Sequence, residues 1–210
     1  MRISPPRVRA WCVRFAESHG GVTGTRVAPD QVTVHAADGA TAVVTVPFPP
    51  LAAEPGEWPG LVVDALADHA ALPRRIGLLL VRLGGHSIGI AEGGRVLAST
   101  TDRRQVHGRN KAGGWSQQRF ARRRAGQARE SLRSAADDAV RVLVPHLAEL
   151  VAVVLGGDRL ALARLREDRR LAGVFALALP RVLDVPEPRR AVLDDAAVRA
   201  LDVEILVTPG

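Results

Sequence analysis

The stretch "IGLLLVRLGGHSIGIAEGGRVLAST", residues 76–100, contains three short apolar segments separated by two Gly-Gly pairs. Glycine readily adopts the positive φ angles of tight hairpin turns, so Gly84-Gly85 and Gly93-Gly94 predict two turns that join three antiparallel strands. The first segment is apolar at nearly every position, which is typical of a strand covered on both faces. We therefore expect a three-stranded meander whose first strand lies at the centre of a sheet.

Downstream of the meander, apolar residues recur at steps of three and four, which predicts a long helix over 116–143 that Pro145 ends. Strands and helices then alternate, and this alternation favours parallel pairing with right-handed crossovers. The expected strands are "VAVVLGG" (151–157), "GVFALAL" (173–179) and "VEILV" (203–207), with helices at "DRLALARLRED" (158–168) and "PEPRRAVLDDAAVRAL" (186–201).

The chain before the meander predicts a smaller domain. "PPRVRAWCVRFAESHGG" (5–21) has helical spacing, and three short β-branched runs between 21 and 46 predict an antiparallel meander. Five prolines over 47–59 argue against regular structure there, and a helix at 61–71 is expected to lead into the main domain. The fold class is therefore α+β / α/β: a small N-terminal α+β domain at 1–60 and a mixed β-sheet with packed helices at 61–210.

The composition is that of a globular chain with an aliphatic core. Of 210 residues, 47% are hydrophobic and 24% are charged, while aromatic residues make up only 3%. The single cysteine, Cys12, leaves no internal disulfide or multi-cysteine metal site, and its place on a helical apolar face predicts a buried small side chain. The start of the chain lacks the apolar core of a secretory signal, and no apolar run is long enough to span a bilayer. We expect a cytoplasmic protein without membrane contact, acting as a monomer.

Positive charge is concentrated in one segment. The formal net charge is +7, and the segment 103–133 alone carries +9 from ten basic side chains and one acid, which leaves −2 for the rest of the chain. A basic excess confined to one segment is typical of a surface that binds nucleic-acid phosphates. The alternative interpretation is a solvated charged surface.

Several kinds of active site find little support in the sequence. It contains neither a G-x-S-x-G nucleophile motif nor a G-x-x-x-x-G-K phosphate loop. His86 and the other histidines of the main domain are scattered singly, which is typical of surface or satisfied core residues rather than metal ligands. Glu92, Asp102 and Asp158 fall at expected strand ends, where a two-metal nuclease would place its ligands, but acids in such places are also common turn and cap residues.

The segment 107–128, "HGRNKAGGWSQQRFARRRAGQA", holds the most unusual combination of residues. Gly113-Gly114 can adopt positive φ angles and approach another backbone closely, while the surrounding arginines can bind phosphates. Ser116 is expected at the N-cap of the long helix, so that Gln117 and Gln118 would lie in its first turn beside exposed N–H groups. The alternative is a polar helix start without further function.

This segment closely resembles the signature of the actinobacterial Vms-type release-factor-like (VLRF) peptidyl-tRNA hydrolases. The surrounding pattern, over roughly residues 74–207, also resembles that family's catalytic domain, which is similar to the middle domain of eukaryotic and archaeal class I release factors. The resemblance implies action on large ribosomal subunits with stalled nascent chains, where the protein would release the peptide from peptidyl-tRNA independently of a stop codon during ribosome rescue. The implied partners are the large ribosomal subunit, peptidyl-tRNA and ribosomal RNA, and no cofactor or protein-bound metal is implied.

The same resemblance assigns roles to individual residues. Classical release factors have a contiguous Gly-Gly-Gln, whereas Trp115 and Ser116 here separate the Gly-Gly pair from the glutamines. The Vms-type relatives carry a Gly-Ser-Gln-like loop, and matching it to Ser116-Gln117 makes Gln117 the first candidate for the catalytic glutamine and Gln118 the alternate. Gly113, Gly114 and Ser116 would complete the catalytic loop. The expected RNA-binding residues are Arg103, Arg104, Arg109, Lys111, Arg119, Arg122, Arg123 and Arg124.

Two other functions stay open at this point. One is a nuclease that cuts tRNA near its 3′ end, an activity also associated with the wider Vms-type group. The other is a factor that binds the ribosome without catalysis. The products distinguish the three functions. Free peptide with intact tRNA indicates the hydrolase, shortened tRNA indicates the nuclease, and binding without either product indicates the non-catalytic factor.

Overall fold

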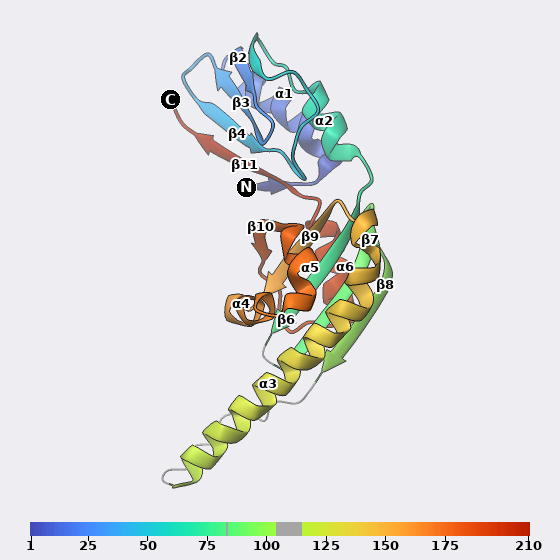
Figure 1. Cartoon of the computed structure of the whole chain (residues 1–210). Helices are drawn as coiled ribbons and strands as arrows, with labels where there is room; N and C mark the ends of the chain where they lie inside the picture. Colours follow the sequence, from blue (N-terminus) through green and yellow to red (C-terminus); the bar gives the residue numbers. More distant parts are fainter. Residues whose placement is uncertain (83, 104–114) are drawn as a thin grey trace. The chain divides into compact units, whose positions relative to one another are not determined.

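The computed structural model describes residues 1–82, 84–103 and 115–210, and it describes side chains for 1–82, 84–102 and 126–210 (Figure 1). The chain divides into two compact units. Unit 1 contains Met1–Pro73 together with Leu201–Gly210, and unit 2 contains Arg74–Ala200. None of the helices in these described ranges has the length and apolarity needed to cross a membrane.

Unit 1 is a six-stranded sheet in the order β1-β11-β4-β3-β2-β5, with two helices against it. Every strand pair in it is antiparallel. Its elements are β1 (Arg2–Ile3), η1 (Pro5–Arg7), α1 (Val8–Ser18), β2 (Val22–Val27), β3 (Gln31–Ala36), β4 (Thr41–Thr45), β5 (Gly56–Pro59), α2 (Asp64–Ala71) and β11 (Val203–Thr208).

Unit 2 is a five-stranded mixed sheet in the order β10-β9-β6-β7-β8, in which β6, β9 and β10 run parallel and β6, β7 and β8 form an antiparallel meander. Its elements are β6 (Arg75–Arg82), β7 (Gly85–Glu92), β8 (Arg95–Arg103), α3 (Trp115–Leu143), η2 (Val144–Glu149), β9 (Ala152–Gly157), α4 (Arg159–Arg166), η3 (Arg169–Leu171), α5 (Ala172–Ala176), β10 (Ala178–Leu183) and α6 (Arg190–Arg199).

Helices cover both faces of the unit 2 sheet. Ile88 and Ile90 of β7 belong to the same buried cluster as side chains of α3, α4 and α5. Gly89 between them faces the other side, where a Cβ would lie 2.9 Å from the Leu193 Cδ2 of α6. Because alternate residues of a strand face opposite sides, α3, α4 and α5 cover one face and α6 covers the other.

The sequence-based fold class is confirmed, because the chain folds into two β-sheets with packed helices. The meander is confirmed in detail: β6 is the central strand of the five, and Gly84, Gly93 and Gly94 all have positive φ. The long helix runs one residue further at its start than expected, from Trp115 to Leu143. Cys12 is fully buried, and burial raises the pKa of its thiol to about 11.

The last strand was assigned to the wrong sheet. "VEILV" was expected to extend the parallel sheet of the main domain, but β11 lies in unit 1, antiparallel to both β1 and β4. Val203 and Ile205 are buried in the unit 1 core there. Helix α2 packs into this same core through Leu66, so it belongs to unit 1 rather than leading into the main domain. The main domain was expected at 61–210, after a small domain at 1–60, whereas unit 2 begins at Arg74 and ends at Ala200.

Two further local expectations were wrong. The proline-rich stretch 47–59 contains a strand, β5, which pairs with β2 at the outer edge of the unit 1 sheet. Proline is compatible with such a place because an edge strand has one side without ladder hydrogen bonds.

"GVFALAL" was expected as one strand, but helix α5 ends at Ala176 and β10 begins at Ala178. Short apolar runs fit a buried helix as well as a buried strand.

The place of β11 can be tested with one substitution. Ile205 is 2% exposed, so Ile205→Ala should lower the free energy of unfolding of unit 1 by about 2–4 kcal/mol. Hydrogen exchange should then be faster at β4 amides and unchanged at β6 amides. Leu206→Ala is the matched control, because its side chain is 66% exposed on the same strand and its loss should have little effect. Faster exchange at β6 instead would contradict the assignment of β11 to unit 1.

Candidate functional site

The candidate site lies where β8 is joined to α3. Of the residues selected from the sequence, Arg103 is the last residue of β8. Gly113 and Gly114 lie outside the described residues, as do Arg104, Arg109 and Lys111. Ser116, Gln117 and Gln118 lie in the first turn of α3, and the structure describes their backbone only; the same holds for Arg119, Arg122, Arg123 and Arg124 in the turns that follow. Because the helix already includes Trp115, Ser116 is not its N-cap, contrary to the expectation.

The second half of α3 anchors this site to the sheet. Among its described side chains, the first buried one from the N-terminal side is Ser131, and burial continues at Ala135, Ala139 and Val142. These positions recur at steps of three and four, so they form one face of the helix. The small alanine side chains allow the helix backbone to lie close to β7 and β8.

Hydrogen bonds fix this contact at the end of β8. Ser134 Oγ of α3 donates to Asp102 Oδ2 of β8 at 3.1 Å. His86 Nε2 of β7 lies 2.8 Å from Asp138 Oδ2 of α3, and the His86 side chain is only 1% exposed. His86 is paired with Asp102 in the β7–β8 ladder, so these bonds join β7, β8 and α3 at one level of the sheet. We call His86, Asp102, Ser134 and Asp138 the anchor cluster.

Asp138 holds its charge although it is partly buried. Burial acts to raise the pKa of its carboxyl, but hydrogen bonds with His86 and Arg141 lower that pKa by more, so the net result is a pKa below the ordinary value. The Arg141 guanidinium donates to Asp138 Oδ1 at 2.7 Å, which leaves each carboxylate oxygen with a partner. A buried polar pair of this kind is directional, so it fixes the orientation of a helix more strictly than apolar packing does.

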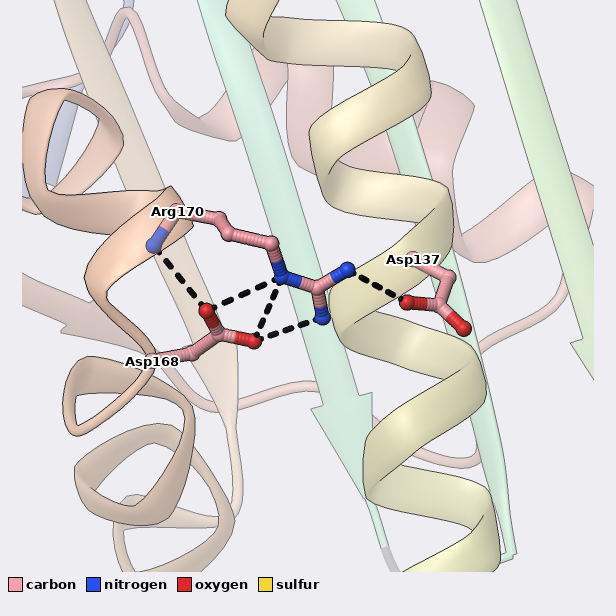
Figure 2. Close-up of polar contacts among 3 residues, drawn as sticks. All are labelled: Asp137, Asp168 and Arg170. Atoms are coloured by element: carbon pink, nitrogen blue, oxygen red, sulfur yellow. Dashed lines mark hydrogen bonds and ion pairs between the residues drawn. The ribbon is translucent and has the colours of Figure 1, made fainter.

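A second polar contact holds α3 on its exposed side (Figure 2). Arg170 of η3 donates to Asp137 Oδ1 of α3 at 2.8 Å and to Asp168 Oδ2 at 2.7 Å. The Arg170 hydrogen bonds lower the pKa of the Asp168 carboxyl, and the two carboxylates raise the pKa of Arg170. Both Arg170 and Asp137 are more than half exposed, so the contact adds orientation and contributes little energy.

Helix α3 carries the candidate glutamines far from this anchor. Gln117 precedes Ser134 by seventeen residues, and a rise of 1.5 Å per residue places it about 26 Å further along the helix axis. Figure 1 shows the N-terminal half of α3 extending beyond the strands of unit 2. The arrangement can therefore present the start of α3 at a distance from the body of unit 2.

The described part of the basic segment is available for binding. Arg129 and Arg133 are exposed, and neither forms a hydrogen bond or ion pair with another residue whose side chain the structure describes. By contrast, Arg75, Arg190 and Arg199 of the same unit all pair with acids. Arginines of α3 that have no partner among the described side chains fit a surface that binds phosphates.

The three acids considered as metal ligands do not come together. Glu92 pairs with Arg95 at one end of the β7–β8 ladder, and Asp102 lies opposite His86 near the other end. Six residues of strand separate these ends, which is about 20 Å. Asp158 caps α4 by accepting from the Leu160 and Ala161 N–H groups. In the described part of the chain, no group of three or more histidine, cysteine, aspartate or glutamate side chains could hold a metal ion.

The partners in the anchor cluster were not found from the sequence. His86 was expected to be a surface or satisfied core histidine, and the structure confirms the core place and adds the partner, Asp138, fifty-two residues away. Each segment nevertheless has a sequence feature that indicates a buried polar contact. His86 interrupts an apolar strand, and Asp138 stands next to Ala139 on the helix face that packs on the sheet.

A family model and several solved structures are similar to this chain. The family model described as Actinobacteria/chloroflexi VLRF1 release factor matches residues 74–206. No curated protein matches the chain. A structure titled "Archaeal protein" has a TM-score of 0.42 and 17% identity, and covers 78% of this chain and 48% of that one. The structure of the archaeal translation termination factor aRF1 has a TM-score of 0.45 and 14% identity. The match covers 94% of this chain and 70% of that one. The chain thus spans about half the length of the first structure.

The anchor cluster predicts a pH-dependent loss of stability. Asp138→Ala leaves the buried His86 without its partner, and should lower the free energy of unfolding of unit 2 by about 1–3 kcal/mol at neutral pH. The folded-state pKa of Asp138 is lowered, so its contribution is present above the ordinary aspartate pKa of about 4 and is lost as the pH falls through the lowered value. Urea unfolding of wild type and variant should therefore converge in acid.

Asp137→Ala is the control for this measurement. It removes the neighbouring carboxylate of the same helix, but its pair with Arg170 is exposed, and the expected loss is below about 1 kcal/mol. If both variants lost the same stability at every pH, the contact between Asp138 and His86 would stabilise unit 2 no more than an exposed ion pair does.

Proposed function

The chain belongs to the Actinobacteria/chloroflexi VLRF1 release factor family, and from this premise we propose that it hydrolyses peptidyl-tRNA on large ribosomal subunits that carry stalled nascent chains. The family match covers both sides of the β8–α3 junction and agrees with the resemblance drawn from residues 107–128. Membership in a release-factor family gives the chain a release-factor-like role in translation. The specific reaction, its site and its ribosomal partners are the proposal.

In the proposed reaction, the oxygen of a water molecule attacks the carbonyl carbon of the ester between the peptide and the tRNA. The ester C–O bond breaks, the peptide leaves with a new carboxyl group, and the tRNA regains its 3′-hydroxyl together with a proton from the water. Gln117 is the residue proposed to orient the water, because a carboxamide offers a donor and an acceptor in fixed geometry. A carboxamide is too weak a base to deprotonate water, so positioning is its role.

The geometry of α3 supports this proposal. The peptidyl-transferase centre is enclosed by RNA, so a protein group can reach it only on a narrow projection. Helix α3 provides such a projection, with the anchor cluster at one end and Gln117 about 26 Å away along the axis. Gly113 and Gly114 are proposed to allow close approach to RNA, and the arginines of the segment 103–133 are proposed to bind ribosomal phosphates.

The test that distinguishes the candidate functions uses labelled peptidyl-tRNA on isolated large subunits in a gel that resolves peptide, tRNA and their conjugate. Free peptide with intact tRNA is the expected product. A shortened tRNA would replace the hydrolase proposal with nuclease activity, and stable binding without either product would leave a non-catalytic factor.

Substitution of the two glutamines tests the site. Gln117→Ala should retain folding and subunit binding but lose release on the order of 10²-fold, because one preorganised polar group is removed. Gln118→Ala should have a milder effect, since successive helix positions differ by about 100° around the axis. Single-turnover release on saturated subunits is the measurement. If Gln118→Ala were inactive and Gln117→Ala active, the two roles would be exchanged, and two fully active variants would remove the glutamine mechanism.

The basic segment gives a separate prediction about binding. Replacing Arg122, Arg123 and Arg124 with Gln should weaken binding to large subunits and reduce its dependence on salt. The variant would make fewer phosphate contacts, so its binding would release fewer counterions. Binding is measured by co-sedimentation across a salt series. The matched control replaces three exposed arginines on other elements, Arg7, Arg14 and Arg95, none of which pairs with another described side chain. Equal weakening by both triple variants would reduce the effect to net charge alone.

A further inference from the structure

A groove lies on unit 2 between α4 and β10, the strand at the opposite edge of the sheet from β8. It has a volume of about 420 Å³, and eight of its ten lining residues are apolar. The other two are Arg159 and Arg166, both from α4. The groove thus combines an apolar lining with two positive charges.

Both arginines are available to a ligand. Their side chains are exposed, and neither forms a hydrogen bond or ion pair with another residue whose side chain the structure describes. The Arg166 guanidinium lies over the ring of Phe175, 5.0 Å from its centroid. A guanidinium that contacts an aromatic ring in this way can still donate its N–H groups to an anion. Arg159 and Arg166 are seven residues apart, so they lie on the same face of α4, about 10 Å apart along the axis.

The opposite wall of the groove is an edge strand. β10 is the outermost strand of the five-stranded sheet, and it pairs only with β9 among the described strands. Its register with β9 is irregular between Ala178 and Val182, and Leu179 and Pro180 from this irregular part line the groove. An edge strand offers unpaired backbone N–H and C=O groups to an extended chain.

These features favour a peptide over RNA as the occupant. Sites for single-stranded RNA supply open aromatic faces on which bases stack. Here the one aromatic ring in the lining, Phe175, is covered by Arg166, and the remaining apolar lining is aliphatic or proline. A second groove, in unit 1 between α1 and α2, does not share the excess of positive charge, because its lining contains Glu17 and Asp68 as well as Arg9 and Arg14.

We propose that the α4–β10 groove binds an acidic, apolar peptide segment of a partner protein. Its carboxylates bind Arg159 and Arg166, and its aliphatic side chains pack against Leu179 and Val182, which are partly exposed in the groove. The proposal concerns a partner-binding surface and does not depend on the hydrolysis reaction.

The test uses the full chain and fluorescein-labelled peptides of about ten residues, in which glutamate alternates with leucine. Fluorescence anisotropy should show saturable binding of this peptide. A peptide in which lysine alternates with leucine should not bind, because its charges match those of the groove. The double variant Arg159→Glu/Arg166→Glu should weaken binding of the acidic peptide by roughly 10- to 100-fold.

Two controls separate the groove from the general charge of the chain. Arg164→Glu/Arg169→Glu makes the same change of net charge at exposed arginines outside the groove that pair with no described side chain, and should leave peptide affinity within about twofold. Ala163→Glu introduces a carboxylate into the groove, and should weaken binding without removing a positive charge. Both sets of sites are exposed, so the variants should fold.

Three results would overturn the proposal. The first is the absence of acidic-peptide binding at concentrations up to about 1 mM. The second is equal weakening by the two double variants, which would indicate diffuse attraction. The third is binding of a labelled oligouridylate that depends on Arg159 and Arg166 while the acidic peptide does not bind, which would make the groove an RNA site instead.

Discussion

The structure of unit 2 depends on how the second half of α3 is held against β7 and β8. Helix α3 has 29 residues; among its described side chains burial begins at Ser131, and Figure 1 shows its N-terminal half extending beyond the strands of unit 2. A small rotation of the anchored part therefore causes a large displacement at the other end of the helix. A tilt of about 10° at the anchor would move a point 26 Å away by about 4–5 Å, which is more than the length of a hydrogen bond. A contact that fixes the angle of α3 therefore matters more for a distant site than its free energy suggests.

Two kinds of contact share this task. The alanine-rich face of α3 brings the helix close to the sheet, but small apolar contacts have little directional preference. The hydrogen bonds from His86 to Asp138 and from Ser134 to Asp102 are directional, and they reach both strands of the β7–β8 pair. A buried polar pair contributes little net stability compared with an apolar pair of the same volume, so its presence here is explained better by orientation than by energy.

The sequence predicts local features of this chain well and long-range partnerships poorly. The Gly-Gly turns and the periodic face of α3 are encoded by neighbouring residues, so the meander and the helix follow directly from the pattern. β11 does not, because alternating Val203, Glu204 and Ile205 fit the unit 1 sheet as well as the main one, and the choice depends on β1 and β4, which lie far away in the sequence. The same limit applies to the candidate site. Its glutamines and arginines can be read from one segment, whereas the pair of His86 and Asp138 joins two segments fifty-two residues apart.

Net charge is a second property whose meaning depends on the fold. The chain has 29 lysine and arginine residues, and many of the arginines are neutralised by nearby acids: Arg190 by Asp194 on α6, Arg170 by Asp137 and Asp168 beside α3. These residues contribute to the formal charge but present little of it to a partner. Arg129 and Arg133 on α3 form no such pairs with described residues, nor do the exposed arginines of α4. Among the described residues, the positive charge available for recognition is therefore smaller than the number of arginines indicates, and the distribution of acids helps to determine where it lies.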